Sequence, residues 1–272
     1  VGTSGWRYAG WRGDFYPPGL RQREELAFAA SRLTSVEING SFYSLQRPSS
    51  FESWRRQVPD DFAFAVKGGR YITHLRRLAD VEAPLANFFA SGILALGSTL
   101  DAVLWQLPAR QAFDARLLSD FFALLPRSTT EVAELATRHD DKLPEARALT
   151  TARGCTPVRH ALEPRHESFG QQEALDLLRE HDIALVQSDS AGTWPQFSSV
   201  TSSLVYVRLH GDTELYRSGY SGSALDMWAD RIRGWTADGL DVLAYFDNDA
   251  RGHAPHDAVA LLDRLPGLRE TT

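Results

Sequence analysis

The sequence predicts an α/β fold, a (β/α)8 barrel of the TIM type, in a single domain that covers residues 1–272. Apolar, strand-like runs alternate strictly with helix-like segments, and this alternation predicts a parallel sheet. Eight such runs in a chain of 272 residues are typical of a closed barrel. Each run ends in polar or charged residues, and active sites of this fold lie at the carboxyl ends of the strands. The predicted strands are Gly2–Ser4, Val36–Asn39, Phe62–Lys67, Val103–Gln106, His160–Glu163, Ile183–Ser188, Leu204–His210 and Val242–Asp247.

Helical periodicity fills most of the intervals between these strands. The interval Arg127–Pro157 is longer than a usual connection, and we expect it to be a surface excursion with a short helix, Thr130–Arg138. The loop Ser190–Ser203 follows a strand end, and two roles are open for it, a cover over the site or an ordered surface loop. Ser49 is the expected cap of one helix. The other predicted helices are Arg23–Arg32, Ser49–Gln57, Val81–Ala95, Asp114–Leu125, Gln171–His181, Ser223–Ala237 and His256–Leu265.

Composition is that of a globular protein without a membrane span. Hydrophobic residues make up 43% of the chain and charged residues 24%, and no apolar run is long enough to cross a bilayer. The net charge of −6 disfavours non-specific binding to nucleic acid, although it is compatible with a local basic pocket. Cys155 is the single cysteine, which rules out an internal disulfide and favours the cytoplasm. The numbered chain starts on a strand-like segment, so no signal peptide is predicted within it; oligomeric state is not indicated.

The alternation of side chains along each strand predicts which of them face the inside of the barrel. In the third strand Phe62, Phe64 and Val66 share one face, which suits the helix layer, so Lys67 points to the barrel mouth. The same reasoning applied to the other strands predicts one polar cluster: Glu37, Asn39, Lys67, Gln106, Glu163, Arg165, Asp189, Arg208, His210 and Asp247. Any one of them could be a structural cap or ion-pair partner, but burying so many charges without a use is costly.

The motifs around these strand ends resemble those of the YecE-like family, a family of unknown function, over nearly the whole chain. The resemblance implies a TIM barrel and brings no established reaction, so function has to be argued from the site. The matching segments are Gly2-Thr3-Ser4-Gly5-Trp6, Val36-Glu37-Ile38-Asn39, Ala65-Val66-Lys67 with Arg70, Ile72-Thr73-His74, Gln106-Leu107-Pro108, Glu163 with Arg165-His166, Tyr206-Val207-Arg208-Leu209-His210-Gly211, and Tyr245-Phe246-Asp247-Asn248-Asp249 with Gly252-His253-Ala254.

The residue types in the predicted cluster favour an anion-binding, catalytic pocket. Arginine forks match phosphate and carboxylate, so we expect a small anionic or phosphorylated ligand and, as the reaction, hydrolysis of a phosphorylated or nucleotide-like substrate. The catalytic candidates are Glu163, His210, Asp247, Glu37 and Lys67. The substrate-binding candidates are Arg70, Arg165, Arg208, Asn39, Gln106, Tyr245, Trp6 and His253. Among the other aromatic residues, Trp194 and Tyr206 could stack on a base or sugar, whereas Trp11 and Tyr43 are expected in the core.

Glu163 is the leading acid–base group or nucleophile. It ends a strand on the inward face, and Arg165 follows two residues later. Nearby cations should keep its carboxylate ionised, which favours a base or nucleophile over a general acid. The alternative is a structural role in which Glu163 only holds an arginine.

Three other functions remain open at this point. The first is a metal-dependent phosphoesterase or nuclease, whose ligands would be Glu163, Asp189, His210 and Asp247. No local metal motif supports it, and the cations of the site would repel a metal ion. We therefore expect no tightly bound metal, and no other cofactor is indicated. The second is a glycosidase-like hydrolase with Glu37 and Glu163 as its two carboxylates. The third is a non-catalytic binder of a phosphorylated metabolite or of single-stranded nucleic acid.

Overall fold

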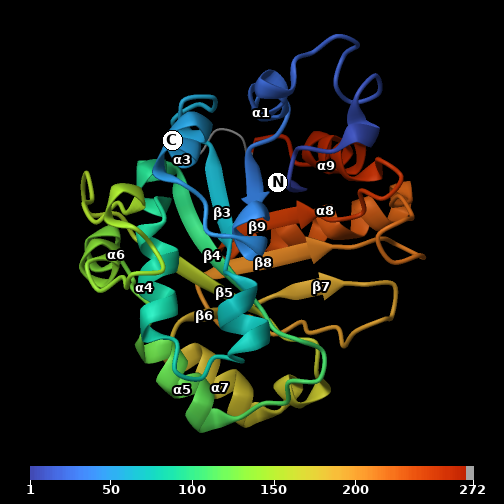
Figure 1. The fold of residues 1–272 in the computed structure, drawn as a ribbon. Helices are drawn as coiled ribbons and strands as arrows, with labels where there is room; N and C mark the ends of the chain where they lie inside the picture. The colour runs from blue at the N-terminus through green and yellow to red at the C-terminus, as the bar shows by residue number, and fades with distance from the viewer. Residues whose placement is uncertain (268–272) are drawn as a thin grey trace.

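The computed structural model describes residues 1–267; the last five residues of the predicted domain lie outside the described residues. Within residues 1–267, nine strands form one sheet in which every pairing is parallel (Figure 1). The strands are β1 (Gly2–Ser4), β2 (Ser35–Ile38), β3 (Ala63–Lys67), β4 (Leu100–Gln106), β5 (Arg159–Glu163), β6 (Ile183–Leu185), β7 (Gln187–Asp189), β8 (Leu204–Leu209) and β9 (Asp241–Phe246).

The sheet is a nearly closed barrel. Its strand order is β6-β5-β4-β3-β2-β1-β9-β8-β7, so the two edge strands are consecutive in the chain. The predicted sixth strand, Ile183–Ser188, is divided at Val186, because β6 pairs with β5 and β7 pairs with β8. The backbone N–H of Val186 donates to the Leu162 carbonyl at 2.9 Å. One segment thus changes its partner midway, which gives nine strands where eight were predicted.

The helices lie on the outside of the sheet (Figure 1). They are α1 (Glu25–Ala30), α2 (Gly40–Tyr43), α3 (Pro48–Arg55), α4 (Glu82–Ala90), α5 (Ala115–Ala123), α6 (Thr129–Ala136), α7 (Gln172–Glu180), α8 (Gly222–Ala237) and α9 (His253–Asp263). A π-helical turn, η3 (Tyr71–Leu75), follows β3. None of the helices in residues 1–267 is both long enough and apolar enough to span a bilayer.

Two helix boundaries differ from the sequence-based expectation. The helix predicted over Val81–Ala95 ends at Ala90, because Gly92 adopts a left-handed conformation with φ of 118°. Helix α3 begins at Pro48 rather than after a Ser49 cap; proline suits the first helical position because its missing N–H would have no partner there. The short helix predicted in the long excursion is present as α6.

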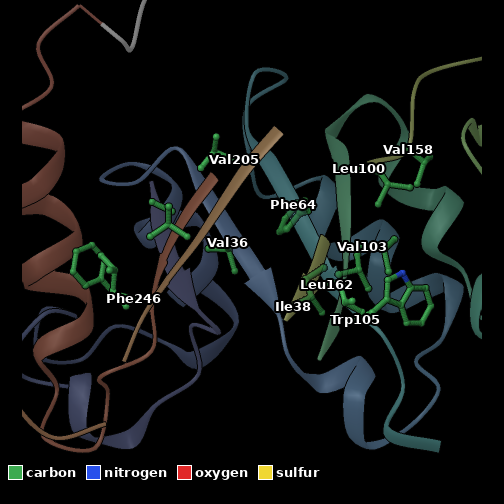
Figure 2. Packing of buried hydrophobic residues seen from close by; sticks show 14 of the residues in the cluster. Val36, Ile38, Phe64, Leu100, Val103, Trp105, Val158, Leu162, Val205 and Phe246 are labelled. Carbon is green, nitrogen blue, oxygen red and sulfur yellow. The ribbon is translucent and has the colours of Figure 1, made fainter. Parts of the chain in front are cut away.

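The two faces of the strands have the residues that the alternation predicts. The outward face packs large side chains such as Phe64, Trp105 and Leu162 against the helix layer, as Figure 2 shows. The inward face forms a separate cluster with small and aromatic side chains, among them Ala65 and Tyr206. Burial of each large side chain contributes roughly 1.5–3 kcal/mol. The small inward residues leave room, toward the carboxyl ends of the strands, for charged side chains.

Candidate functional site

Arg208 on β8 lies at the centre of a buried charged cluster. Its Nη2 is 2.8 Å from Oε1 of Glu37 on β2 and 3.1 Å from Oδ2 of Asp247, which directly follows β9. Its Nη1 is 2.8 Å from Oε2 of Glu163, the last residue of β5. Three strands that are distant in sequence therefore bring their carboxylates to one guanidinium.

Both oxygens of Glu37 are occupied. Oε1 also accepts a hydrogen bond from Ser4 at 2.5 Å, and Oε2 accepts from the Tyr206 hydroxyl at 2.6 Å and from Arg208 Nε at 3.1 Å. The Glu37 side chain is fully buried. Glu37 therefore holds Arg208 in place. Arg208 was predicted from the sequence to bind the ligand. The arginine is engaged by protein groups on every nitrogen.

Glu163 has donors on both of its carboxylate oxygens. Oε2 accepts from Gln106 Nε2 at 2.8 Å and from Arg208, while Oε1 lies 3.2 Å from Arg165 Nη2. Burial opposes ionisation of this carboxyl, but the positive charges of Arg208 and Arg165 outweigh it and hold the pKa of Glu163 well below its ordinary value. Glu163 is thus a carboxylate at neutral pH.

His210 joins two of the carboxylates. Its Nδ1 lies 3.0 Å from Asp247 Oδ2, and its Nε2 lies 3.5 Å from Glu163 Oε1. The imidazole is fully buried, and the rings of Trp194 and Tyr216 pack edge-on against it. His210 thus hydrogen-bonds Asp247 through Nδ1, while its Nε2 faces Glu163 without a hydrogen-bond partner among the described residues.

Asp249, just beyond Asp247, has the opposite character to Glu163. Burial and the neighbouring Asp247 charge raise the pKa of Asp249 to about 6. For Asp247, burial is outweighed by Arg208 and His210, which lower its pKa to about 2. The Tyr8 hydroxyl lies close to Asp249 and donates to the Ser4 carbonyl at 2.5 Å. Asp249 belongs to the Tyr245–Asp249 motif, yet nothing in its residue type distinguished it from a capping aspartate.

Lys67, at the end of β3, is a buried amine. Its Nζ lies 4.7 Å above the centre of the Phe42 ring, and within residues 1–267 it has neither a hydrogen-bond acceptor nor an ion-pair partner. Burial, followed by the Arg208 charge, lowers the pKa of Lys67 below its ordinary value. An amine left without a partner in a charged cluster is a group available to a ligand.

Further cations surround Lys67 on one side of the mouth. His74 on η3 lies near Lys67, Arg165 and Arg70, and burial together with these charges lowers its pKa. Arg70 is exposed. The mouth thus has a basic side and, around Asp247 and Asp249, an acidic side. His74 was a motif residue without a predicted role.

The loop Ser190–Ser203 covers part of this mouth, which is one of the two roles that the sequence left open for it. The Trp194 ring stacks on the Arg165 guanidinium, whose Cζ is 3.5 Å from the ring centre, and also contacts His210. Tyr216 closes the same side, its hydroxyl 3.5 Å from Arg165. Tyr216 adopts φ of 62°, a strained conformation for a residue with a side chain. No sequence signal identified Tyr216.

Several predicted site residues lie elsewhere. Asp189 accepts a hydrogen bond from the Tyr220 hydroxyl at 3.2 Å and does not join the cluster, because it faces the segment that leads into α8. The side chain of Tyr245 is fully buried in the barrel interior, where its ring centre lies 5.2 Å from that of Tyr206. Trp6 packs on Trp54 in the core.

The remaining predictions have mixed outcomes. His253 begins α9 and faces Gly219 rather than the cluster. Asn39 supports the site indirectly by donating to Ser4 Oγ at 2.7 Å. Trp11 is in the core as predicted, whereas the prediction for Tyr43 is wrong, since its ring is 72% exposed.

The predicted metal ligands do not form a metal site. Glu163, His210 and Asp247 are adjacent, but both oxygens of Glu163 and Oδ2 of Asp247 are engaged by other side chains, and Asp189 lies apart. Within the part of the chain that the structure describes, no group of three or more His, Cys, Asp or Glu side chains is arranged to hold a metal ion.

The fold and the site define a parallel α/β barrel protein with a charged cluster at the carboxyl ends of its strands. Two crystal structures have the same fold: a DUF72 family protein from Thermotoga maritima MSB8 (TM-score 0.74, 23% identity, 97% of this chain and 98% of that one) and a DUF72 family protein from Enterococcus faecalis V583 (TM-score 0.72, 18% identity, 97% and 94%).

Sequence comparison gives the family. A model described as "Protein of unknown function DUF72" matches residues 1–271, and the chain belongs to this family. The YecE-like resemblance is to the same family in a coarser sense. The UPF0759 protein YunF of Bacillus subtilis (strain 168) is 31% identical over 77 residues, which cover 28% of this chain and 26% of YunF.

Proposed function

We propose that the barrel mouth binds a small phosphorylated or otherwise anionic ligand and hydrolyses it. The observation that carries this proposal is Lys67: its side chain is buried, and its amine has no hydrogen-bond or ion-pair partner in residues 1–267, which leaves it available to an anion. Arg165 and Arg70 add charge on the same side. Arg208, in contrast, is fully used by carboxylates and serves to position them.

The proposed chemistry uses two carboxyl groups with opposite tendencies. Neighbouring arginines keep Glu163 ionised, so it acts as the base that activates water or as the nucleophile. Asp249, whose pKa is raised to about 6, is the proton donor to the leaving group. Two carboxyls with pKa values pushed apart are a recurring basis for acid and base roles. The proton that Glu163 removes from water passes to His210, which lies between Glu163 and Asp247, while Asp249 gives its own proton to the leaving group and regains one from solvent.

The other candidate reactions have less support. A glycosidase-like pair needs two carboxylates at the mouth. Within residues 1–267, Glu37 is engaged only by the buried side chains of Ser4, Tyr206 and Arg208, whereas Glu163 Oε1 lies against the partly exposed Arg165. A metal-dependent reaction would need a different set of ligands from the one predicted, since Asp189 lies apart. A non-catalytic binder would use the same cations without the carboxyl pair. Measuring turnover together with binding distinguishes such a binder from a hydrolase.

The test combines a binding assay with a turnover assay. Wild-type protein should bind inorganic phosphate by calorimetry and hydrolyse a phosphomonoester or phosphodiester such as p-nitrophenyl phosphate or its diester. Glu163→Gln should bind phosphate but lose turnover by roughly a hundredfold or more. If the wild type binds phosphate but shows no turnover, the protein is a non-catalytic binder and the proposed hydrolysis is wrong. If it does not bind phosphate, the whole proposal is wrong.

We further propose that residues 1–272 form one domain, of the TIM-like type, and that the protein works in the cytoplasm. The nine-stranded sheet corresponds to eight strand segments if β6 and β7 are counted as one. The single cysteine, Cys155, is exposed and unpaired, which suits a reducing compartment.

A further inference from the structure

Close to Lys67 lies a hollow of about 320 Å³, which we call the aromatic cavity. Its walls come from α2 and the residues after it, from the turn that leads into η3, and from α4. The rings of Phe42, Tyr43, Tyr71 and Phe88 line it, and most of its surface is carbon. The volume is at the lower end of the range for small-molecule sites.

Phe42 connects the aromatic cavity to the proposed anion site. Its ring lies under Lys67 Nζ, 4.7 Å from the ring centre, and the same residue lines the cavity. Arg70, which belongs to the basic side of the mouth, also lines it, and Lys142 stands at its rim. An anionic group at Lys67 would thus have apolar surface directly beside it and positive charge around both.

Two of the four aromatic residues that line the cavity are unusually exposed. Tyr43 is 72% and Tyr71 47% exposed, and Leu75, on the same π-helical turn as Tyr71, is 61% exposed. Among residues 1–267 only Met227, on α8, is another large exposed apolar side chain. Exposed apolar residues that gather at one place mark a binding surface, and π-helical turns are frequent at functional sites.

We infer that the aromatic cavity holds the planar, aromatic part of the ligand whose anionic group binds at Lys67, so that the ligand class is a mononucleotide or an aryl phosphate. This inference rests on the proposed anion site. Flat rings suit the walls because tyrosine and phenylalanine stack on them, and stacking on a base contributes to affinity without sequence preference. Charge complementarity selects an anion over a neutral apolar molecule, since Arg70 and Lys142 border the cavity.

The test compares three probes that differ only in what they place in the cavity: inorganic phosphate, ribose 5-phosphate and AMP. On the wild type, AMP should bind at least roughly tenfold more tightly than ribose 5-phosphate, as expected for a stacked base. In the double variant Tyr43→Ala, Tyr71→Ala this advantage should disappear, while the affinity for phosphate stays unchanged. Both side chains are largely exposed, so the fold should tolerate the change.

A second variant blocks the cavity instead of removing its walls. A Cβ on Gly69 would meet its nearest neighbour, the Ser41 carbonyl oxygen, at 3.8 Å, which is ordinary contact. A side chain can therefore start at this position, which lines the cavity, and Gly69→Leu adds bulk there. It should weaken AMP and spare phosphate, whereas Gly69→Ala should change neither. Met227→Ala, a distant exposed apolar residue, is the matched control for the tyrosine variants.

The outcomes distinguish the two proposals. If the wild type binds none of the three probes, the anion site itself fails. If it binds phosphate and ribose 5-phosphate but AMP no more tightly, the anion site stands and the aromatic cavity is not a base site. An AMP advantage that survives both the double tyrosine variant and Gly69→Leu would also overturn the inference.

Discussion

Arg208 and Glu37 form a two-point ion pair in which both side chains are fully buried: Nη2 to Oε1 is 2.8 Å and Nε to Oε2 is 3.1 Å. Lys67, in the same cluster, has no such partner among the described residues. The two cations therefore have different roles. Arg208 fixes three carboxylates in place, and Lys67 is the cation that we propose binds the ligand.

Glu37→Gln should destabilise the protein strongly. The substitution removes one charge of a buried pair and leaves part of Arg208 uncompensated, which typically costs about 3–5 kcal/mol. Urea unfolding would measure the loss as a lower midpoint with an unchanged slope. Asp230→Asn, which breaks the exposed pair with Arg233, is the control and should change stability by less than about 1 kcal/mol. Equal effects of the two substitutions would contradict the structural role of Glu37.

Lys67→Met should abolish phosphate binding while keeping or raising the free energy of unfolding at neutral pH. Methionine has a similar length and carries no charge to bury. Phosphate should raise the Tm of the wild type and not that of the variant. Arg179→Met, at an exposed cation on α7, should retain the phosphate response. A full phosphate-induced shift in Lys67→Met would refute the assignment of Lys67.

The difference in unfolding free energy between the wild type and Lys67→Met should depend on pH, and its sign can be predicted. The folded-state pKa of Lys67 is lowered, so between that value and the unfolded value of about 10.4 the unfolded chain binds more protons. Wild-type stability should therefore rise relative to Lys67→Met as pH increases through this window. A difference that grows with pH in favour of the variant would be inconsistent with a buried, unpaired amine.

The alternation of residues along the strands was enough to predict much of the site. It placed Glu37, Glu163, Arg208 and His210 on the inward face, because period-two geometry is set by the backbone and needs no knowledge of partners. The same rule failed at Asp189, where the strand is interrupted at Val186 and changes its pairing. A break in a strand depends on both neighbours and is not visible in one segment.

Other features depend on contacts between distant segments. Whether an arginine is saturated or available is decided by how many carboxylates reach it, so Arg208 was predicted to bind a ligand although three acidic side chains surround it. The exposure of Tyr43 depends on how α2 sits on the barrel. The raised pKa of Asp249 results from burial beside Asp247, and the sequence shows only two aspartates with one residue between them.

Asp249→Asn should change how the free energy of unfolding depends on pH in the acidic range. The folded-state pKa is about 6 and the unfolded value about 3.9, so the folded protein binds more protons between these values. The stability that Asp249 contributes is present below pH 4 and lost as pH rises through 6. Because the side chain is partly exposed, we expect a gain of only about 1 kcal/mol for the variant above pH 6. Unfolding curves at pH 4, 5, 6 and 7 would show it; parallel pH profiles for the two proteins would exclude a raised pKa.

Trp194→Ala should weaken phosphate binding by roughly two- to thirtyfold, the range that a cation–π contact of about 0.5–2 kcal/mol gives. The Trp194 ring lies 3.5 Å from Cζ of the Arg165 guanidinium. Without this ring, the contacts that hold Arg165 within residues 1–267 are its hydrogen bonds to Glu163 and Tyr216. Calorimetric titration with phosphate measures the change. Trp235→Ala, which removes a tryptophan 5.0 Å from Arg231 on α8, should lower stability and leave the phosphate Kd unchanged. If Trp194 were only a lid, the variant would bind and release phosphate faster with the same Kd, and that result would show that Arg165 does not depend on the ring for its position.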